Sequence, residues 1–267
     1  MKKNIFYLIV VFIAIFSGCS VKDDIKPADE GKIIILLYHR ISNGEASNIY
    51  ERSVIDFEAD LMYLIYNNIN IISFNDLNTI KESGKMPAGH SAIISFDDGD
   101  CTWFTSAIPL LKKYRMKATF FLWTEMIGRN SFIKQAEIEY MSNYMLPDGV
   151  RPFSFGSHTY SHQYLFQRKA GFSSIDEYNL FLDYELGKSK SLIETYIYED
   201  VTGLALPFGD GAGDPEIIAA AKRNGYRFIR TSINGIIGSA DIDLLNLPSL
   251  PMLDKTDQEE IGYYLNN

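Results

Sequence analysis

Two short clusters of polar residues in this sequence carry side chains suited to hydrolytic metal chemistry. Asp97 and Asp98 stand side by side in SAIISFDDGD, after a short apolar run, and His158 and His162 stand four residues apart in GSHTYSH. Neighbouring side chains at a strand end point in different directions, so one aspartate can bind a metal while the other faces water on that metal. One Asp and two His leave a coordination position open, as in catalytic zinc sites.

Apolar segments directly precede both clusters and are expected to position them. The run 92–94 is short, β-branched and followed by the turn-forming Gly99, which is typical of a buried strand. A second apolar segment, 153–155, leads into the histidines. His39 follows the apolar run 32–38 in the same way, and Pro207-Phe208-Gly209 follows 201–206. These candidates therefore stand at the carboxyl ends of strands, where barrel-type α/β folds place their sites.

The rest of the chain alternates between strand and helix patterns. The expected strands are 32–38, 70–73, 91–96, 118–122, 153–156, 201–206, 226–230 and 244–247, and the expected helices are 53–67, 74–82, 103–114, 135–144, 176–198, 215–224 and 256–265. We expect Ser53 and Asp214 to cap helices. The apolar side of helix 176–198 is expected to carry Leu180, Tyr184, Leu192 and Ile193. Alternation without repeats predicts one α/β domain with a parallel sheet.

Three motifs in this order resemble the polysaccharide deacetylase family, of the NodB-homology, carbohydrate esterase 4 type. They are SFDDG, SHTYSH and LALPFGD at 204–210, and the resemblance runs from about residue 32 to about 265. The opening LLYHR at 36–40 is similar to the branch that includes poly-N-acetylglucosamine deacetylases. The resemblance implies a distorted, incomplete (β/α) barrel formed by a single NodB-homology domain, 32–267.

The resemblance also implies a role for each motif residue. Asp98, His158 and His162 are the expected ligands of Zn²⁺, for which other divalent transition metals could substitute. Asp97 is the expected general base. The backbone N–H of Phe208 is the expected donor to the developing oxyanion.

The general acid requires a different assignment, because the histidine of the family's C-terminal Leu-x-His motif is absent here. The four histidines are residues 39, 90, 158 and 162. In the branch with an N-terminal Tyr-His pair, the early histidine takes the acid role, so His39 is the candidate. His90 stands in a polar loop and is interpreted as a solvated bystander.

The third motif departs from the family pattern at one position. The family commonly carries an Arg two residues before the Pro, where this chain has Ala205. In the family that Arg orients the base aspartate, so either Arg40 or Arg230 replaces it here or the site is tuned differently. Four aromatic residues could stack on a sugar, namely Trp103, Trp123, Tyr160 and Phe208. For Trp123, packing in the core is the favoured prediction.

Residues 1–19 are predicted to be a targeting segment. Lys2 and Lys3 precede an apolar run of twelve residues, 5–16, which is the pattern of a signal peptide. The run ends in Phe-Ser-Gly-Cys, which resembles a bacterial lipobox. We expect a signal peptide at 1–18, lipidation of Cys19, a flexible tether at 19–31, and a lipid anchor in the cell envelope, at the outer membrane or cell surface.

Charge and cysteine content narrow the function classes. The net charge of −9 becomes −11 once residues 1–18, with two lysines and no acidic residue, are removed. An acidic protein without a basic cluster is a poor nucleic-acid binder. Cys101 is the only cysteine besides Cys19, so lipidation of Cys19 leaves Cys101 without a partner for an intrachain disulfide. We expect the thiol of Cys101 to be packed and unreactive.

The sequence therefore predicts a membrane-anchored, metal-dependent hydrolase that removes N-acetyl groups from a polysaccharide containing N-acetylglucosamine. Exopolysaccharide is the favoured substrate and peptidoglycan stays open as an alternative. A non-catalytic glycan-binding lipoprotein on the same fold is the rival from another class. The sequence does not indicate an oligomeric state.

Overall fold

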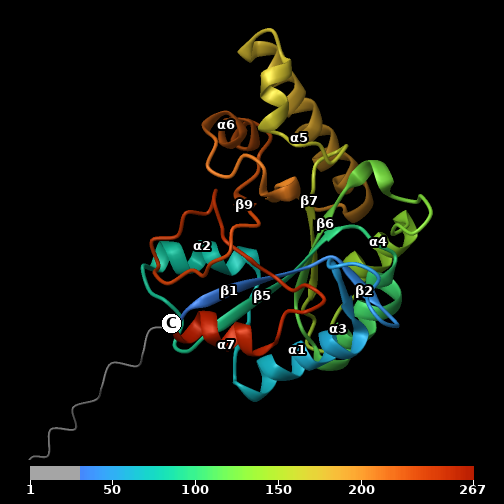
Figure 1. Cartoon of the computed structure of the whole chain (residues 1–267), viewed down its shortest axis with the longest axis vertical. Helices are drawn as coiled ribbons and strands as arrows, with labels where there is room; N and C mark the ends of the chain where they lie inside the picture. The colour runs from blue at the N-terminus through green and yellow to red at the C-terminus, as the bar shows by residue number, and fades with distance from the viewer. Residues whose placement is uncertain (1–30) are drawn as a thin grey trace, which may run out of the picture.

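The computed structural model describes residues 31–267 (Figure 1). The predicted signal peptide, the lipidated Cys19 and all of the tether except Gly31 lie outside the described residues, so these remain predictions. Within the described part, none of the helices has the length and apolarity needed to cross a bilayer.

A curled parallel sheet forms the centre of the molecule. Its strands run in the order β10-β1-β5-β6-β7-β8-β9, and β4 also pairs with β5. Their bounds are β1 Ile33–Tyr38, β4 Asn70–Ile71, β5 Ser91–Asp98, β6 Ala118–Leu122, β7 Phe153–Ser157, β8 Gly203–Ala205, β9 Phe228–Arg230 and β10 Leu250–Pro251. The path ends at β9 and β10 without closing, which confirms the predicted incomplete (β/α) barrel.

Helices surround the outside of this half-barrel (Figure 1). They are α1 Val54–Tyr66, α2 Phe74–Ser83, α3 Ile108–Tyr114, α4 Gln135–Asn143, α5 Ile175–Ile197, α6 Pro215–Arg223 and α7 Glu259–Asn266. Ser53 and Asp214 cap α1 and α6 as predicted, since their side chains accept hydrogen bonds from first-turn N–H groups. A second, two-stranded parallel sheet pairs β2 Arg40–Ser42 with β3 Glu51–Ser53.

One predicted helix differs from the prediction in type, and one predicted strand is absent from the described residues. The helix predicted at 103–114 is a π-helical turn, Trp103–Ala107, followed by α3, with Pro109 in the first turn of α3, where its missing N–H costs little. The strand predicted at 244–247 does not form. Leu247 makes only an isolated bridge to Arg230, and the last strand is β10, which pairs with β1.

The inward face of α5 also differs from the prediction. Leu180 and Tyr184, expected on the apolar side, are 71% and 51% exposed. The buried residues of this helix are Tyr178, Leu182, Glu185, Leu186, Ser189, Ile193 and Ile197. Two of them are polar, and both form hydrogen bonds to the loop and strand that carry His158. Ile193 is buried as predicted, and five of the seven buried residues are hydrophobic, so the prediction is wrong at Leu180 and Tyr184 and not for the whole face.

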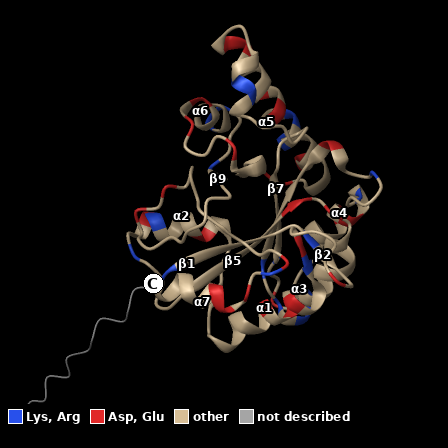
Figure 2. Ribbon diagram, in the orientation of Figure 1, with Lys and Arg blue, Asp and Glu red and all other residues tan. Residues whose placement is uncertain are grey.

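Charged side chains lie mainly on the outer helices and loops, where acidic and basic residues are interspersed (Figure 2). Arg52 and Asp60 are an exception, with 1% and 0% exposure. Two guanidinium nitrogens of Arg52 donate to the two carboxylate oxygens of Asp60 at 2.9 and 2.6 Å. Its third nitrogen donates to the carbonyls of Leu253 and Thr256, and Tyr38 donates to Asp60. This network joins β1, β3 and α1 to the C-terminal segment.

We expect Asp60→Asn to lower the free energy of unfolding by about 3–5 kcal/mol, because it leaves the buried Arg52 cation without its counterion. Urea denaturation followed by circular dichroism measures the change. Glu58→Gln is the matched control, since Glu58 lies on the same helix in an exposed ion pair with Lys113. A loss no larger for Asp60→Asn than for Glu58→Gln would show that the buried pair is dispensable.

Candidate active site

Asp98, His158 and His162 converge at the carboxyl ends of the strands. Asp98 is the last residue of β5, and the histidines lie in the loop that follows β7. Oδ1 of Asp98 lies 3.5 Å from Nε2 of His158 and 3.3 Å from Nε2 of His162. The two Nε2 atoms are 3.1 Å apart. The structure thus brings together the three residues that the sequence predicts as metal ligands.

These separations fit a single small cation. Ligand atoms placed 2.0–2.2 Å from a tetrahedral Zn²⁺ lie about 3.3 Å from one another. Two imidazole nitrogens and one carboxylate oxygen suit zinc and also other divalent transition metals. A set of three protein ligands leaves the fourth position for water or substrate.

The ring of His158 is held in the orientation that a ligand requires. The ring is buried, and its Nδ1 lies 2.9 Å from the carbonyl oxygen of Ala205. A carbonyl can only accept, so Nδ1 carries the proton and Nε2 presents its lone pair to the cluster. Burial acts to lower the pKa of His158, but Asp97 and Asp98 outweigh it and raise the pKa.

Asp98 is stabilised as a carboxylate. Burial acts to raise its pKa, but the two histidines outweigh burial and hold the pKa of Asp98 well below its usual range. Its backbone has a φ of 85°, a left-handed conformation that is uncommon for a residue other than glycine. Such strained residues concentrate at functional sites.

Asp97 has a different partner from its neighbour. Its side chain is buried, and both carboxylate oxygens contact a guanidinium nitrogen of Arg230, the last residue of β9, which is fully buried. Arg40, the other cation considered, pairs instead with Glu51 at 3.2 Å. Arg230 therefore occupies the place beside the aspartate that Ala205 leaves without a cation. Asp97 also lies 3.6 Å from Nε2 of His158, next to the metal-binding group.

His39 lies in the same pocket as Asp97, Asp98 and the two histidines, a cleft of about 580 Å³. The indole N–H of Trp103 donates to the backbone carbonyl of His39 at 2.6 Å and fixes this end of β1. Within the described residues, Nδ1 of His39 is buried and has no hydrogen-bond partner. Burial lowers the pKa of His39, against the opposing effect of Asp98 and Asp97.

Phe208 lines the same cleft as His39. It lies in a single 3₁₀ turn, Pro207–Gly209, with a left-handed φ of 59°. Its ring stacks on Tyr164 with centroids 4.0 Å apart and contacts His162 edge-on at 4.7 Å. The structure therefore places all six predicted site residues around one cleft.

Predictions for the other aromatic residues have mixed outcomes. Trp103 is fully buried and cannot stack on a sugar. Trp123, expected in the core, is only partly buried and stacks on His162 with centroids 4.7 Å apart. Tyr160 does not line the cleft, and its ring lies under the amine of Lys188.

Four further residues that line the cleft were not predicted from the sequence. Ile49, Tyr50, Tyr164 and Leu253 line it, and the Tyr50 ring lies 5.3 Å from that of His39. Tyr50 stands in a polar segment without a recognisable motif. Tyr164 is two residues beyond His162, so its proximity to the motif was the one available signal.

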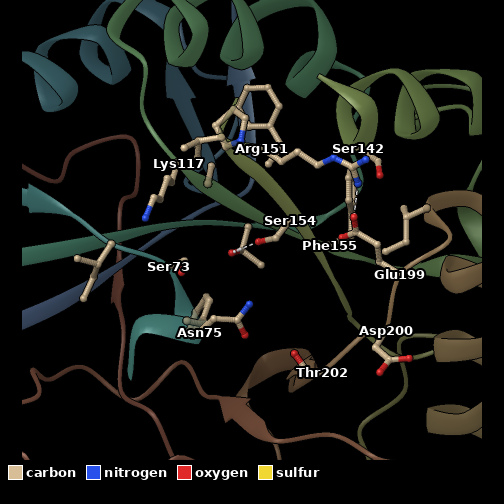
Figure 3. Close-up of a pocket in the computed structure, with 18 of the residues that line it drawn as sticks. Ser73, Asn75, Lys117, Ser142, Arg151, Ser154, Phe155, Glu199, Asp200 and Thr202 are labelled. Atoms are coloured by element: carbon tan, nitrogen blue, oxygen red, sulfur yellow. Dashed lines mark hydrogen bonds and ion pairs between the residues drawn. The ribbon is translucent and has the colours of Figure 1, made fainter. Parts of the chain in front are cut away.

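A second pocket, of about 260 Å³, lies at the amino ends of β6 and β7 (Figure 3). Lys117, Arg151, Ser154 and Thr202 are among its lining residues, and Arg151 forms an ion pair with Glu199. Among the described residues that line it, no buried polar side-chain atom lacks a hydrogen-bond partner. The unpartnered histidine and the metal-binding group both belong to the cleft at the carboxyl ends.

Comparison with known proteins agrees with this geometry. Residues 84–229 match the family model described as polysaccharide deacetylase, which covers more than half of the chain. The chain belongs to the polysaccharide deacetylase family.

Among its relatives, YxkH from Bacillus subtilis is 28% identical over 203 residues, which are 76% of this chain and 65% of YxkH. The poly-beta-1,6-N-acetyl-D-glucosamine N-deacetylase of Staphylococcus epidermidis is 28% identical over 217 residues, 75% of this chain and 72% of that protein. The chain thus spans slightly less than two thirds of the length of YxkH and slightly more than two thirds of the length of the staphylococcal protein.

Solved structures of this family share the fold. Deacetylase PplD from Streptococcus pyogenes, in complex with acetate, superposes with a TM-score of 0.74 at 23% identity and covers 88% of this chain and 98% of its own. IcaB from Ammonifex degensii gives a TM-score of 0.72 at 17% identity, covering 89% and 98%. At these identities the likeness establishes the fold.

We expect His158→Ala to weaken Zn²⁺ binding at least about 10-fold, because it removes one of three ligands. Competition with a chromogenic chelator measures the dissociation constant, on protein without a polyhistidine tag. His90→Ala is the matched control, since His90 accepts a hydrogen bond from the N–H of Lys32 at the amino end of β1. Equal zinc affinity in both variants would contradict the proposed ligand set.

Proposed function

We propose that this protein is a metal-dependent hydrolase that removes N-acetyl groups from a polysaccharide containing N-acetylglucosamine. The observation that carries the proposal is the arrangement in one cleft of a three-ligand group and a separate, Arg-paired Asp97. Membership of the deacetylase family and similarity to staphylococcal poly-N-acetylglucosamine deacetylases support the substrate class.

The two aspartates have different roles in the proposed reaction. A divalent ion held by Asp98, His158 and His162 would supply Lewis acidity for the amide carbonyl and for water. Asp97 stays outside this ligand set and accepts the proton of the attacking water. Arg230 holds the carboxylate of Asp97 in place from behind the cleft. A base that is held in a fixed orientation does not have to reorient during the reaction.

The remaining groups act on the other side of the scissile bond. His39 donates a proton to the leaving amine, which otherwise departs poorly. The N–H of Phe208 donates a hydrogen bond to the oxygen on which negative charge develops. Both residues line the cleft, on strand ends β1 and β8 that flank the metal-binding group.

The walls of the cleft favour a neutral polymer over peptidoglycan. Among the described residues that line it there is no Lys or Arg, and the walls are apolar and aromatic. An adjoining pocket of about 290 Å³ contains Arg40, but Glu51 and Asp100 flank this cation. The carboxylates of a peptidoglycan stem peptide would therefore meet acidic groups without a free cation. A neutral exopolysaccharide meets no such penalty.

Acetate release from N-acetylglucosamine oligomers tests the proposal. The full chain, purified in detergent and loaded with zinc, is incubated with β-1,6- and β-1,4-linked oligomers beside Asp97→Asn. We expect release with a preference for the β-1,6 linkage, and its loss in the variant, because an amide cannot accept the proton. If neither oligomer is deacetylated while both proteins still bind glycan, the protein is a glycan-binding module and the proposal fails.

We expect Arg230→Met to lower kcat about 100-fold while zinc content stays unchanged, because the base loses the contact that orients it but no metal ligand is removed. Steady-state kinetics and metal analysis measure the two quantities. Arg227→Met is the matched control, an exposed arginine three residues earlier in the same segment. Unchanged kcat in Arg230→Met would show that Arg230 does not orient the base.

We also propose that the protein is anchored in the cell envelope through a lipid on Cys19. The lipobox-like sequence before Cys19 supports this, and the acidic surface is compatible with it. Metabolic labelling with an alkyne fatty acid, followed by membrane fractionation, is expected to label the wild type and Cys101→Ser but not Cys19→Ser. A label that persists in Cys19→Ser, or its absence from the wild type, would refute the anchor.

A further inference from the structure

Helix α5 presents a buried carboxylate to the loop between the two histidine ligands. Glu185 is 2% exposed, and it accepts two hydrogen bonds from Ser161, one from the backbone N–H at 2.8 Å and one from the hydroxyl at 2.6 Å. The backbone carbonyl of Glu185 also accepts the N–H of Tyr160 at 3.1 Å. One residue of α5 therefore binds two consecutive residues that immediately precede His162.

This loop needs external support because its backbone is strained. Thr159 and His162 have left-handed φ values of 64° and 56°. Each such residue costs about 1–3 kcal/mol and persists only where its surroundings fix it. Within the loop, the N–H of His162 donates to the hydroxyl of Thr159 at 3.0 Å. The contacts from Glu185 hold the residues between these two strained positions.

A glutamate is an unusual residue at a buried position of a helix. Among the described residues, no Lys, Arg or His forms an ion pair with it, whereas most buried carboxylates in proteins are paired. Both donors to its carboxylate come from Ser161. An apolar residue at this position of α5 would avoid the free-energy cost of burying a carboxyl group. We therefore look for the role of Glu185 in its hydrogen bonds to the loop.

We propose that Glu185 is a positioning residue for the metal ligand His162, acting through Ser161. The inference rests on the proposed function, since it assumes that the His loop holds a metal. By fixing residues 160 and 161, Glu185 keeps His162 in its left-handed conformation, with Nε2 aimed at Asp98. Without this contact the loop relaxes, and the three ligand atoms no longer lie at the separations that one cation requires.

Metal affinity tests the proposal without relying on activity. In Glu185→Met, the side chain keeps a similar length but accepts neither hydrogen bond, so the backbone N–H and the hydroxyl of Ser161 both lose their partner. We expect the dissociation constant for Zn²⁺ to rise about 10- to 100-fold, as for other residues that orient metal ligands. The visible spectrum of the Co²⁺-loaded full chain is expected to change, because the ligand geometry changes.

Two further variants separate positioning from a general loss of stability. Ser161→Ala removes only the hydroxyl contact, and we expect a smaller loss of affinity that is not additive with Glu185→Met. Asp183→Asn is the matched control, because Asp183 lies on the same helix in an ion pair with Arg223 and is expected to leave affinity and spectrum unchanged.

The outcomes are distinguishable. A wild type that does not bind Zn²⁺ or Co²⁺ contradicts the metal-dependent function itself. A wild type that binds, with Ser161→Ala and any folded Glu185→Met having the same affinity and Co²⁺ spectrum, refutes the positioning role alone. If Glu185→Met does not fold, the affinity and Co²⁺ spectrum of Ser161→Ala decide the question.

Discussion

Two adjacent carboxylates with different partners are the constraint on which this site depends. Asp97 and Asp98 are neighbours in a largely buried strand end, where like charges repel strongly. The structure separates them by giving Asp97 to Arg230 and Asp98 to the two histidines. Each carboxylate can then have its own role, one in metal binding and one in proton transfer.

The curled parallel sheet makes this division of partners possible. The cation for Asp97 comes from β9, the histidines follow β7, and both aspartates end β5. These strands are far apart in the sheet order, and only curvature brings their carboxyl ends around one cleft. The surrounding helices contribute to the site as well as covering the sheet. α5 contacts the His loop directly, and the Arg52–Asp60 pair joins α1 to the segment that carries Leu253 in the cleft wall.

Much of the fold and the candidate site follows from local sequence patterns. The apolar runs before Asp97 and His158 are short and β-branched or aromatic, and they form the strands that were expected. Contacts between residues that are remote in the sequence could not be predicted from these local patterns. Ala205 indicates that a cation is missing, but only the structure distinguishes Arg230 from Arg40. The inward polar face of α5 escaped prediction because Glu185 and Ser189 have partners in the His loop and β7 that are remote in sequence.

The measurement that tests the account most directly is a crystal structure of the zinc-soaked protein, with anomalous diffraction at the zinc edge. We expect one ion within about 2.0–2.2 Å of Asp98, His158 and His162. Asp97 is expected to remain in contact with Arg230 and outside the ligand set, facing the open coordination position. An ion bound elsewhere, or an ion that draws Asp97 away from Arg230 into its ligand set, would contradict the division of roles between the two aspartates.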